Sequence, residues 1–267
     1  MKRTGVIAVL ILSLVAGSVP AEEPSGLELA EEPSALELVE SVYNRPDGED
    51  MQSRLTMTLI NSRGDKRVRE IRQFMKDFGD VEKKVMFFEF PADVRNTSFM
   101  NWSYMTIGED DDQWIYLPAL KKVKRISSDS KGDYFMGSDF TYDDLGDRHP
   151  SSDTHTVLGY ENVNGEPCYV VQSVPIEEEY IYGRTVSWIV ADKWVVVKKD
   201  FYDEDDELLK TLTVDEYGDV DGYWVVTRST MYHIQRDHTT TMVLDDVQLD
   251  TGIPDGRFTE RMMTRGL

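Results

Sequence analysis

The sequence has only one cysteine, Cys168, among its 267 residues, so the chain can form no internal disulfide bond. It has four histidines, and none has the spacing of a zinc finger or of an H-E-x-x-H metal site. It contains no G-x-S-x-G nucleophile motif and no phosphate-binding Gly-rich loop. The sequence therefore gives no positive case for an enzyme, and we expect no cofactor and no metal.

Positive charge is also scarce. The sequence has 29 lysines and arginines against 50 aspartates and glutamates, which gives a formal net charge of −21. Binding to nucleic acid is driven by cationic contacts with phosphate, so this charge argues against nucleic acid as a partner. The charge argues equally against broad adhesion to anionic membrane surfaces.

Long hydrophobic runs are absent except near the N-terminus. Lys2 and Arg3 precede an apolar stretch over residues 6–15, and residues 19–21 (V-P-A) offer a small-residue cleavage site. This pattern predicts a signal peptide over residues 1–21, with an uncleaved anchor as the alternative. Its removal leaves a net charge of −23. No later stretch approaches the ~20 apolar residues of a membrane-spanning helix.

The remaining chain is predicted to hold a flexible acidic segment, residues 22–34, and a single domain, residues 35–267. Ser34 and Glu37 have the spacing of a capping box. Leu36, Val39 and Tyr43 repeat at helical intervals, which indicates a short amphipathic helix that must pack on something.

From residue 51 onward, apolar residues alternate with polar ones in short runs that turn residues separate. Leu55, Met57 and Leu59 share one face of a strand, and Met100 and Trp102 share one face of another. We count roughly eleven such strands and few helices, which is typical of a mainly β, antiparallel barrel or sandwich.

The central stretch, residues 110–145, is predicted to form a hairpin followed by a loop and one helical turn. The first arm carries Trp114 and Tyr116, and the second carries four cations in five positions: Lys121, Lys122, Lys124 and Arg125. The segment that follows is aromatic and lies between two glycines. We predict that it is a movable lid over an apolar cavity, formed by Phe140, Tyr142 and Leu145.

The aromatic and methionine content suits a cavity that accepts variable apolar partners. We therefore predict an apolar ligand groove on the inward faces of several strands. Its predicted lining consists of Leu55, Met57, Leu59, Met100, Trp102, Trp114 and Tyr116.

Four segments resemble the outer-membrane lipoprotein-sorting proteins of the LolA/LolB-like superfamily. They are F-P-A-D-V-R at residues 90–95, D-Q-W-I-Y-L-P at 112–118, K-K-V-K-R-I at 121–126 and F-M-G-S-D-F-T-Y-D-D-L at 135–145. The similarity extends more loosely from about residue 35 to residue 258. The length, acidity and central insertion are closer to the larger branch of this superfamily, which is often associated with RND-type exporters.

This resemblance implies a half-open antiparallel β-barrel with short covering helices. It also implies a periplasmic carrier without catalytic chemistry, which binds the acyl chains of a lipoprotein or lipid and delivers them towards the outer membrane. The implied partners are an inner-membrane RND-type transporter and an outer-membrane acceptor.

Two other classes of protein stay open at this point. A non-catalytic periplasmic adaptor or scaffold would have a filled barrel, and the cations of residues 121–125 would be a docking patch. A hydrolase would need converging polar groups, such as two carboxylates across a cleft. The triplet Asp110, Asp111 and Asp112 does not build that pair, because adjacent residues of an extended segment point in alternate directions.

Overall fold

The computed structural model describes residues 32–267, and residues 33–267 form one compact unit. The signal peptide predicted over residues 1–21 lies outside the described residues, as do residues 22–31 of the predicted acidic segment. Among the described residues, no helix is both long enough and apolar enough to cross a membrane.

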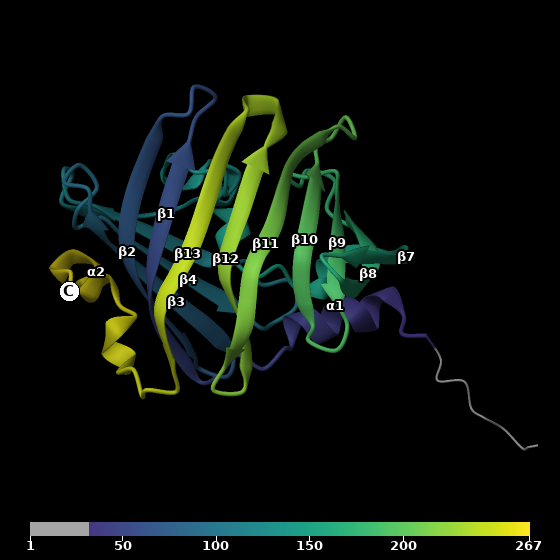
Figure 1. The fold of residues 1–267 in the computed structure, drawn as a ribbon. Coiled ribbons are helices and arrows are strands. Elements are labelled where there is room, and N and C mark those ends of the chain that lie inside the picture. The colour runs from purple at the N-terminus through teal and green to yellow at the C-terminus, as the bar shows by residue number, and fades with distance from the viewer. Residues whose placement is uncertain (1–31) are drawn as a thin grey trace, which may run out of the picture. The chain divides into compact units, whose positions relative to one another are not determined.

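Thirteen strands form one antiparallel sheet, in the order β6-β5-β4-β3-β2-β1-β13-β12-β11-β10-β9-β8-β7 (Figure 1). Strands that follow one another in the sequence pair, except β6 and β7, and β1 also pairs with β13. Their bounds are β1 Asp50–Ile60, β2 Lys66–Asp77, β3 Val81–Phe90, β4 Ser98–Tyr104, β5 Asp112–Leu117, β6 Lys122–Arg125, β7 Asp153–Val163, β8 Glu166–Pro175, β9 Arg184–Val190, β10 Val195–Tyr202, β11 Leu208–Val220, β12 Tyr223–His233 and β13 His238–Leu249.

The sheet does not close, because β6 and β7 form its two edges. It curls strongly enough that β3 and β4 pass behind β13 in Figure 1. The predicted mainly β, half-open antiparallel barrel is confirmed, with thirteen strands instead of roughly eleven. Both faces of this curled sheet carry apolar residues, and a different segment of the chain covers each face.

Two α-helices accompany the sheet within residues 32–267. In α1 (Ala35–Tyr43), Ser34 Oγ accepts a hydrogen bond from the Glu37 amide at 3.2 Å, and the Glu37 carboxylate accepts one from the Ser34 amide at 2.8 Å. Leu38 of α1 is fully buried against Val171 and Ile189. The short α2 (Glu260–Arg265) follows a 3-10 turn at Asp255–Arg257 and packs against β4 and β6.

Alternation along β3 and β4 separates the two surfaces of the sheet. We call the surface that carries Met86, Phe88 and Phe99 the inner face, because these residues cluster with Leu55, Met57 and Leu59 of β1. The outer face carries Val85, Phe87 and Met100, which cluster with Phe258 and Met263 of the C-terminal segment. Both faces are buried here, so β4 reads as an almost unbroken buried strand.

Candidate functional site

The inner face of the sheet is filled by residues 134–145, which we call the plug. The plug begins with a 3-10 turn at Phe135–Gly137 and ends with another at Asp143–Leu145. The Phe135 amide donates to the Phe140 carbonyl at 2.7 Å, which closes the plug into a tight loop. Gly137 sits at a φ of +77°, where a side chain would be strained, so glycine suits this turn.

The apolar side chains of the plug belong to a cluster with residues of β1, β3 and β4, together with Phe201 of β10 and Met231 of β12. Phe135, Phe140 and Leu145 are 1%, 7% and 8% exposed, and they share a cluster with β1 residues Leu55, Met57 and Leu59. The Phe135 ring lies 5.1 Å from that of Phe99 and 5.9 Å from that of Phe88, measured between centroids. Burying three such side chains stabilises this arrangement by ~5 to 9 kcal/mol.

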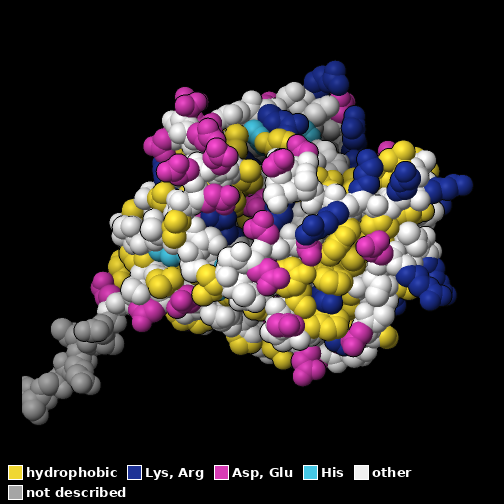
Figure 2. Space-filling model, turned by 180° about the vertical axis from the view of Figure 1, so that it is seen from behind, with side chains coloured by type: hydrophobic (Ala, Val, Ile, Leu, Met, Phe, Trp, Pro, Cys, Tyr) yellow, Lys and Arg dark blue, Asp and Glu magenta, His cyan; other side chains and the backbone are white. Residues whose placement is uncertain are grey.

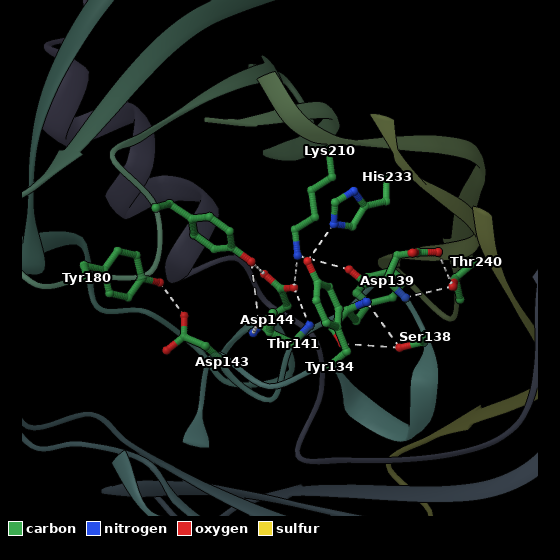
Figure 3. A network of polar contacts seen from close by, with 12 residues as sticks. Tyr134, Ser138, Asp139, Thr141, Asp143, Asp144, Tyr180, Lys210, His233 and Thr240 are labelled. Carbon is green, nitrogen blue, oxygen red and sulfur yellow. Dashed lines mark hydrogen bonds and ion pairs between the residues drawn. The ribbon is translucent and has the colours of Figure 1, made fainter. Parts of the chain in front are cut away.

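The opposite side of the plug is polar and meets β11, β12 and β13 (Figure 3). Lys210 of β11 is fully buried, and its ammonium group lies 2.5 Å from the Asp144 carboxylate. The same ammonium donates to the Asp139 carbonyl oxygen at 3.1 Å. The hydroxyl of Tyr182, just before β9, donates to the second Asp144 oxygen at 2.8 Å. Burial lowers the pKa of Lys210, and the nearby Asp144 charge opposes that shift.

Asp139 is a second buried anchor on the same side of the plug. Its amide donates to the Thr240 hydroxyl at 2.9 Å, and that hydroxyl donates to the Asp139 carboxylate at 2.7 Å. His238 Nδ1 lies 2.7 Å from the same carboxylate oxygen. The Tyr134 hydroxyl lies 2.6 Å from His233 Nε2, and burial lowers the pKa of His233 to about 4. We call the contacts of Asp139 and Asp144 the latch.

A group of ionisable residues lies beside the plug's C-terminal end. Lys84 Nζ donates to the Leu145 carbonyl at 3.3 Å. Burial, and then the charge of Asp147, raises the pKa of the half-buried Glu82 to about 7. The Asp111 carboxylate accepts hydrogen bonds from Ser103 and Asn101, yet burial still raises its pKa.

The structure divides the seven predicted groove residues between the two faces of the sheet. Leu55, Met57 and Leu59 lie on the inner face, in the cluster that the plug completes. The other four belong to the outer cluster: Met100, Trp102, Trp114 and Tyr116. The predicted lid residues Phe140, Tyr142 and Leu145 do lie together, inside the curled sheet and against the first three.

A pocket of about 500 Å³ opens on the outer face, between β3–β5 and the C-terminal segment. The apolar part of its wall comes from Phe78, Met100, Trp102, Trp114 and Phe258, and Lys83 also lines it. Three of the predicted groove residues therefore do border a cavity, although it lies across the sheet from the plug.

The four cations predicted as a docking patch are exposed. Lys121 precedes the edge strand β6, and Lys122, Lys124 and Arg125 belong to it. Arg125 forms an ion pair with Asp112 of β5. Seen from behind, many Lys and Arg side chains gather along the right-hand side of the molecule, whereas Asp and Glu side chains are spread over the face (Figure 2).

Sequence reasoning missed the residues that receive the plug, namely Lys210, Tyr182, His238 and Thr240. A lysine at an inward position of an apolar strand was the one available signal. Its partner Asp144 lies 66 residues away in the sequence, and no local spacing of residues predicts such an ion pair. Among residues 32–267, no group of three or more His, Cys, Asp or Glu is placed to hold a metal ion.

A protein-family model whose description reads "Uncharacterized protein" matches residues 80–265, more than half of the chain. No curated protein matches the sequence. A DUF1329 family protein from Desulfovibrio piger is 30% identical, with a TM-score of 0.81 over 86% of this chain and 97% of that one.

A putative outer membrane lipoprotein-sorting protein domain from Vibrio parahaemolyticus is 33% identical, with a TM-score of 0.81 over 86% of this chain and 98% of that one. A LolA superfamily protein from Nitrosomonas europaea is 18% identical, with a TM-score of 0.66 over 86% and 99% of the two chains. At that identity the Nitrosomonas structure bears on the fold alone.

Proposed function

The chain belongs to the DUF1329 family and has the LolA-like fold, and from this premise we propose that it carries acyl chains on the inner face of its sheet. The observation that carries this proposal is the plug. The inner face is covered by a short loop with three apolar side chains, and such a cover can give way to an apolar ligand without unfolding the sheet.

The two sides of the plug suggest where a ligand enters. On β11–β13 the plug is held both by the latch and by packing with residues such as Met231, whereas on β1, β3 and β4 side-chain packing predominates. Removing Asp144 from Lys210 would leave a buried charge without a partner, which costs ~3 to 5 kcal/mol. The plug therefore separates more easily from β1–β4 than from β11–β13.

We place the acyl chain in that seam, between the plug and Leu55, Met57 and Leu59. Apart from packing, this movement breaks the hydrogen bond of Gln113 to the Tyr142 carbonyl, 2.8 Å long, and that of Lys84 to Leu145. The latch stays intact throughout. The loaded state then keeps the buried Lys210 paired with Asp144.

The exchange is close to balanced. Ten buried methylenes of an acyl chain gain ~8 kcal/mol, and the plug's three apolar side chains give up ~5 to 9 kcal/mol when they leave the strands. A carrier must both load and release, and a near-balanced exchange allows both. Docking to a donor or an acceptor then needs to shift the balance by only a few kcal/mol.

The proposed carrier works in the periplasm, takes a lipoprotein or another lipid from the inner membrane and delivers it towards an outer-membrane acceptor. A donor of the RND exporter type enters this proposal through the family resemblance. The exposed cations of residues 121–125 offer a docking surface for an acidic donor or an acidic acceptor.

Binding of a diacylated lipopeptide by the purified protein tests the proposal. Met57→Gln places a polar amide in the seam and should weaken binding at least tenfold. Met263→Gln is the matched control, because Met263 is equally buried but lies on the outer face; the two residues are 0% and 1% exposed. Equal effects of the two variants would count against an inner-face site.

One observation favours a second candidate, a non-catalytic adaptor or scaffold. The inner face is already filled, as expected of a barrel that carries no ligand. Native mass spectrometry of the protein purified from its membrane-containing host separates the two. A carrier retains lipid mass, and a scaffold shows the bare chain under all conditions.

A further inference from the structure

The outer-face pocket combines an apolar wall with a lysine ammonium that lies over two aromatic rings. Trp102 and Trp114 stand edge to face, with ring centroids 5.1 Å apart, and Met100 and Phe258 complete the wall. The Lys83 ammonium lies 3.7 Å from the Trp102 ring centroid and 4.5 Å from that of Phe78. The pocket volume of about 500 Å³ is typical of small-molecule sites.

Lys83 has no carboxylate partner among residues 32–267, and its contacts are with the two aromatic rings. Its neighbour Lys76, by contrast, pairs with Asp255 at 2.8 Å. An ammonium without a carboxylate partner beside an apolar wall indicates that an anionic group is the missing partner.

We propose that this pocket binds a single-chain amphiphile with an anionic head group. The alkyl chain lies along Trp102, Trp114 and Met100, and the head group meets Lys83. A lysine ammonium is a point charge that binds a carboxylate or a phosphate equally well. The ligand is therefore defined by one anionic head group on one apolar tail. Three other charged residues line the pocket: Asp255, which pairs with Lys76, and Glu260 and Arg261, which carry opposite charges. Lys83 is the cation that lies against the apolar wall.

This site is separate from the inner face and does not depend on the proposed carriage of acyl chains there. Strands β3 and β4 lie between the two, with Phe88 and Phe99 facing the plug and Phe87 and Met100 facing the pocket. A ligand in the pocket leaves the latch and the plug in place.

Bromine quenches tryptophan fluorescence only at short range, so bromododecanoate reports directly on Trp102 and Trp114. We expect it to bind and to quench the wild-type protein. In the double variant Trp102→Phe/Trp114→Phe, calorimetry should still detect binding while the quenching disappears. Binding without quenching in the wild type would place the ligand on the inner face, which overturns this proposal and leaves the proposed function standing.

The role of the cation is tested with dodecanoate, dodecyl phosphate and dodecanol below their micellar concentrations. Lys83→Met should weaken binding of both anions about tenfold, the loss expected for one charged hydrogen bond, and should leave dodecanol unchanged. Lys83→Arg should retain most of the affinity. Lys124→Met, an exposed lysine of β6, is the control and should have no effect.

A preference of the wild type for one anion over the other identifies the head group. Equal binding of dodecanoate to the wild type and to Lys83→Met would overturn the proposal. So would the absence of binding by all three probes, or quenching that persists in the double variant.

Discussion

Replacing Phe140 with alanine should destabilise the empty protein and increase its affinity for an acyl chain. Phe140 is a plug residue, 7% exposed, that packs on the inner-face cluster. In the empty protein the variant leaves a cavity, which should cost ~3 to 5 kcal/mol of unfolding free energy. In the loaded protein the acyl chain fills that space, so most of the cost is recovered.

The gain in affinity follows from the competition between plug and ligand. A wild-type ligand must displace a phenylalanine whose burial is worth ~1.5 to 3 kcal/mol. Without that competitor, binding should become ~10 to 100 times tighter. A residue that serves only as fixed structure has no reason to show opposite effects on stability and on affinity.

The assay pairs urea unfolding with calorimetric titration of a diacylated lipopeptide. Phe87→Ala is the matched control, because Phe87 is equally buried, at 4% exposed, but lies on the outer face. The control should lose similar stability and keep wild-type affinity. Unchanged or weaker binding by a folded Phe140→Ala variant would refute the exchange of plug for ligand.

Three further predictions concern charged residues of the plug, of β3 and of β6. Lys210→Met should cost ~3 to 5 kcal/mol of unfolding free energy, because it leaves Asp144 buried and unpaired. Lys210→Met/Asp144→Leu should recover much of that loss, and equal losses of the two variants in urea unfolding would mean that the pair is not coupled. Because the pKa of Glu82 is raised to about 7, the folded protein holds a proton there that the unfolded chain releases near pH 4.5. The free energy of unfolding should therefore fall by at most ~3 kcal/mol as pH rises between those values. Glu82→Gln should flatten this pH dependence in urea unfolding, and an unchanged dependence would show that Glu82 is not its source. Lys122→Glu/Lys124→Glu should slow association with an acidic partner and reduce its salt dependence in stopped-flow measurements, and unchanged rates at low salt would make these residues ordinary surface lysines.

The strands and the fold class could be predicted because both depend on local patterns. The alternation of Leu55, Met57 and Leu59 placed these residues together on one face of β1, where the structure has them. The capping box of Ser34 and Glu37 likewise gave the start of α1. Such signals lie within a few residues of each other and need no knowledge of distant contacts.

The assignment of faces could not be predicted in the same way. In β4, residues 98–101 are all buried, because the plug covers one face and the C-terminal segment the other. Periodicity then no longer tells inside from outside, and Met100 and Trp102 were grouped with Leu55 although they point away from it. Only the long-range cover, from residues 134–145 and 253–265, decides between the two faces.

The latch could not be predicted from the sequence for a related reason. In the sequence, Asp139 and Asp144 are two acidic residues of the predicted lid segment, and Lys210 is one lysine in a distant strand. Their partnership depends on the curl of the sheet, which brings β11 and β13 to the plug. A buried ion pair across 66 residues of sequence is a property of the fold.

Photo-crosslinking with a lipopeptide whose acyl chain carries a terminal diazirine tests the central claim most directly. The account predicts that the chain lies between the plug and β1–β4, so the crosslinks should map to Leu55, Met57, Leu59, Phe88 and Phe99. The latch residues Lys210 and Thr240 should stay unlabelled, because the plug covers them in both states. Labelling of Lys210 and Thr240, or of the outer face alone, would contradict the account.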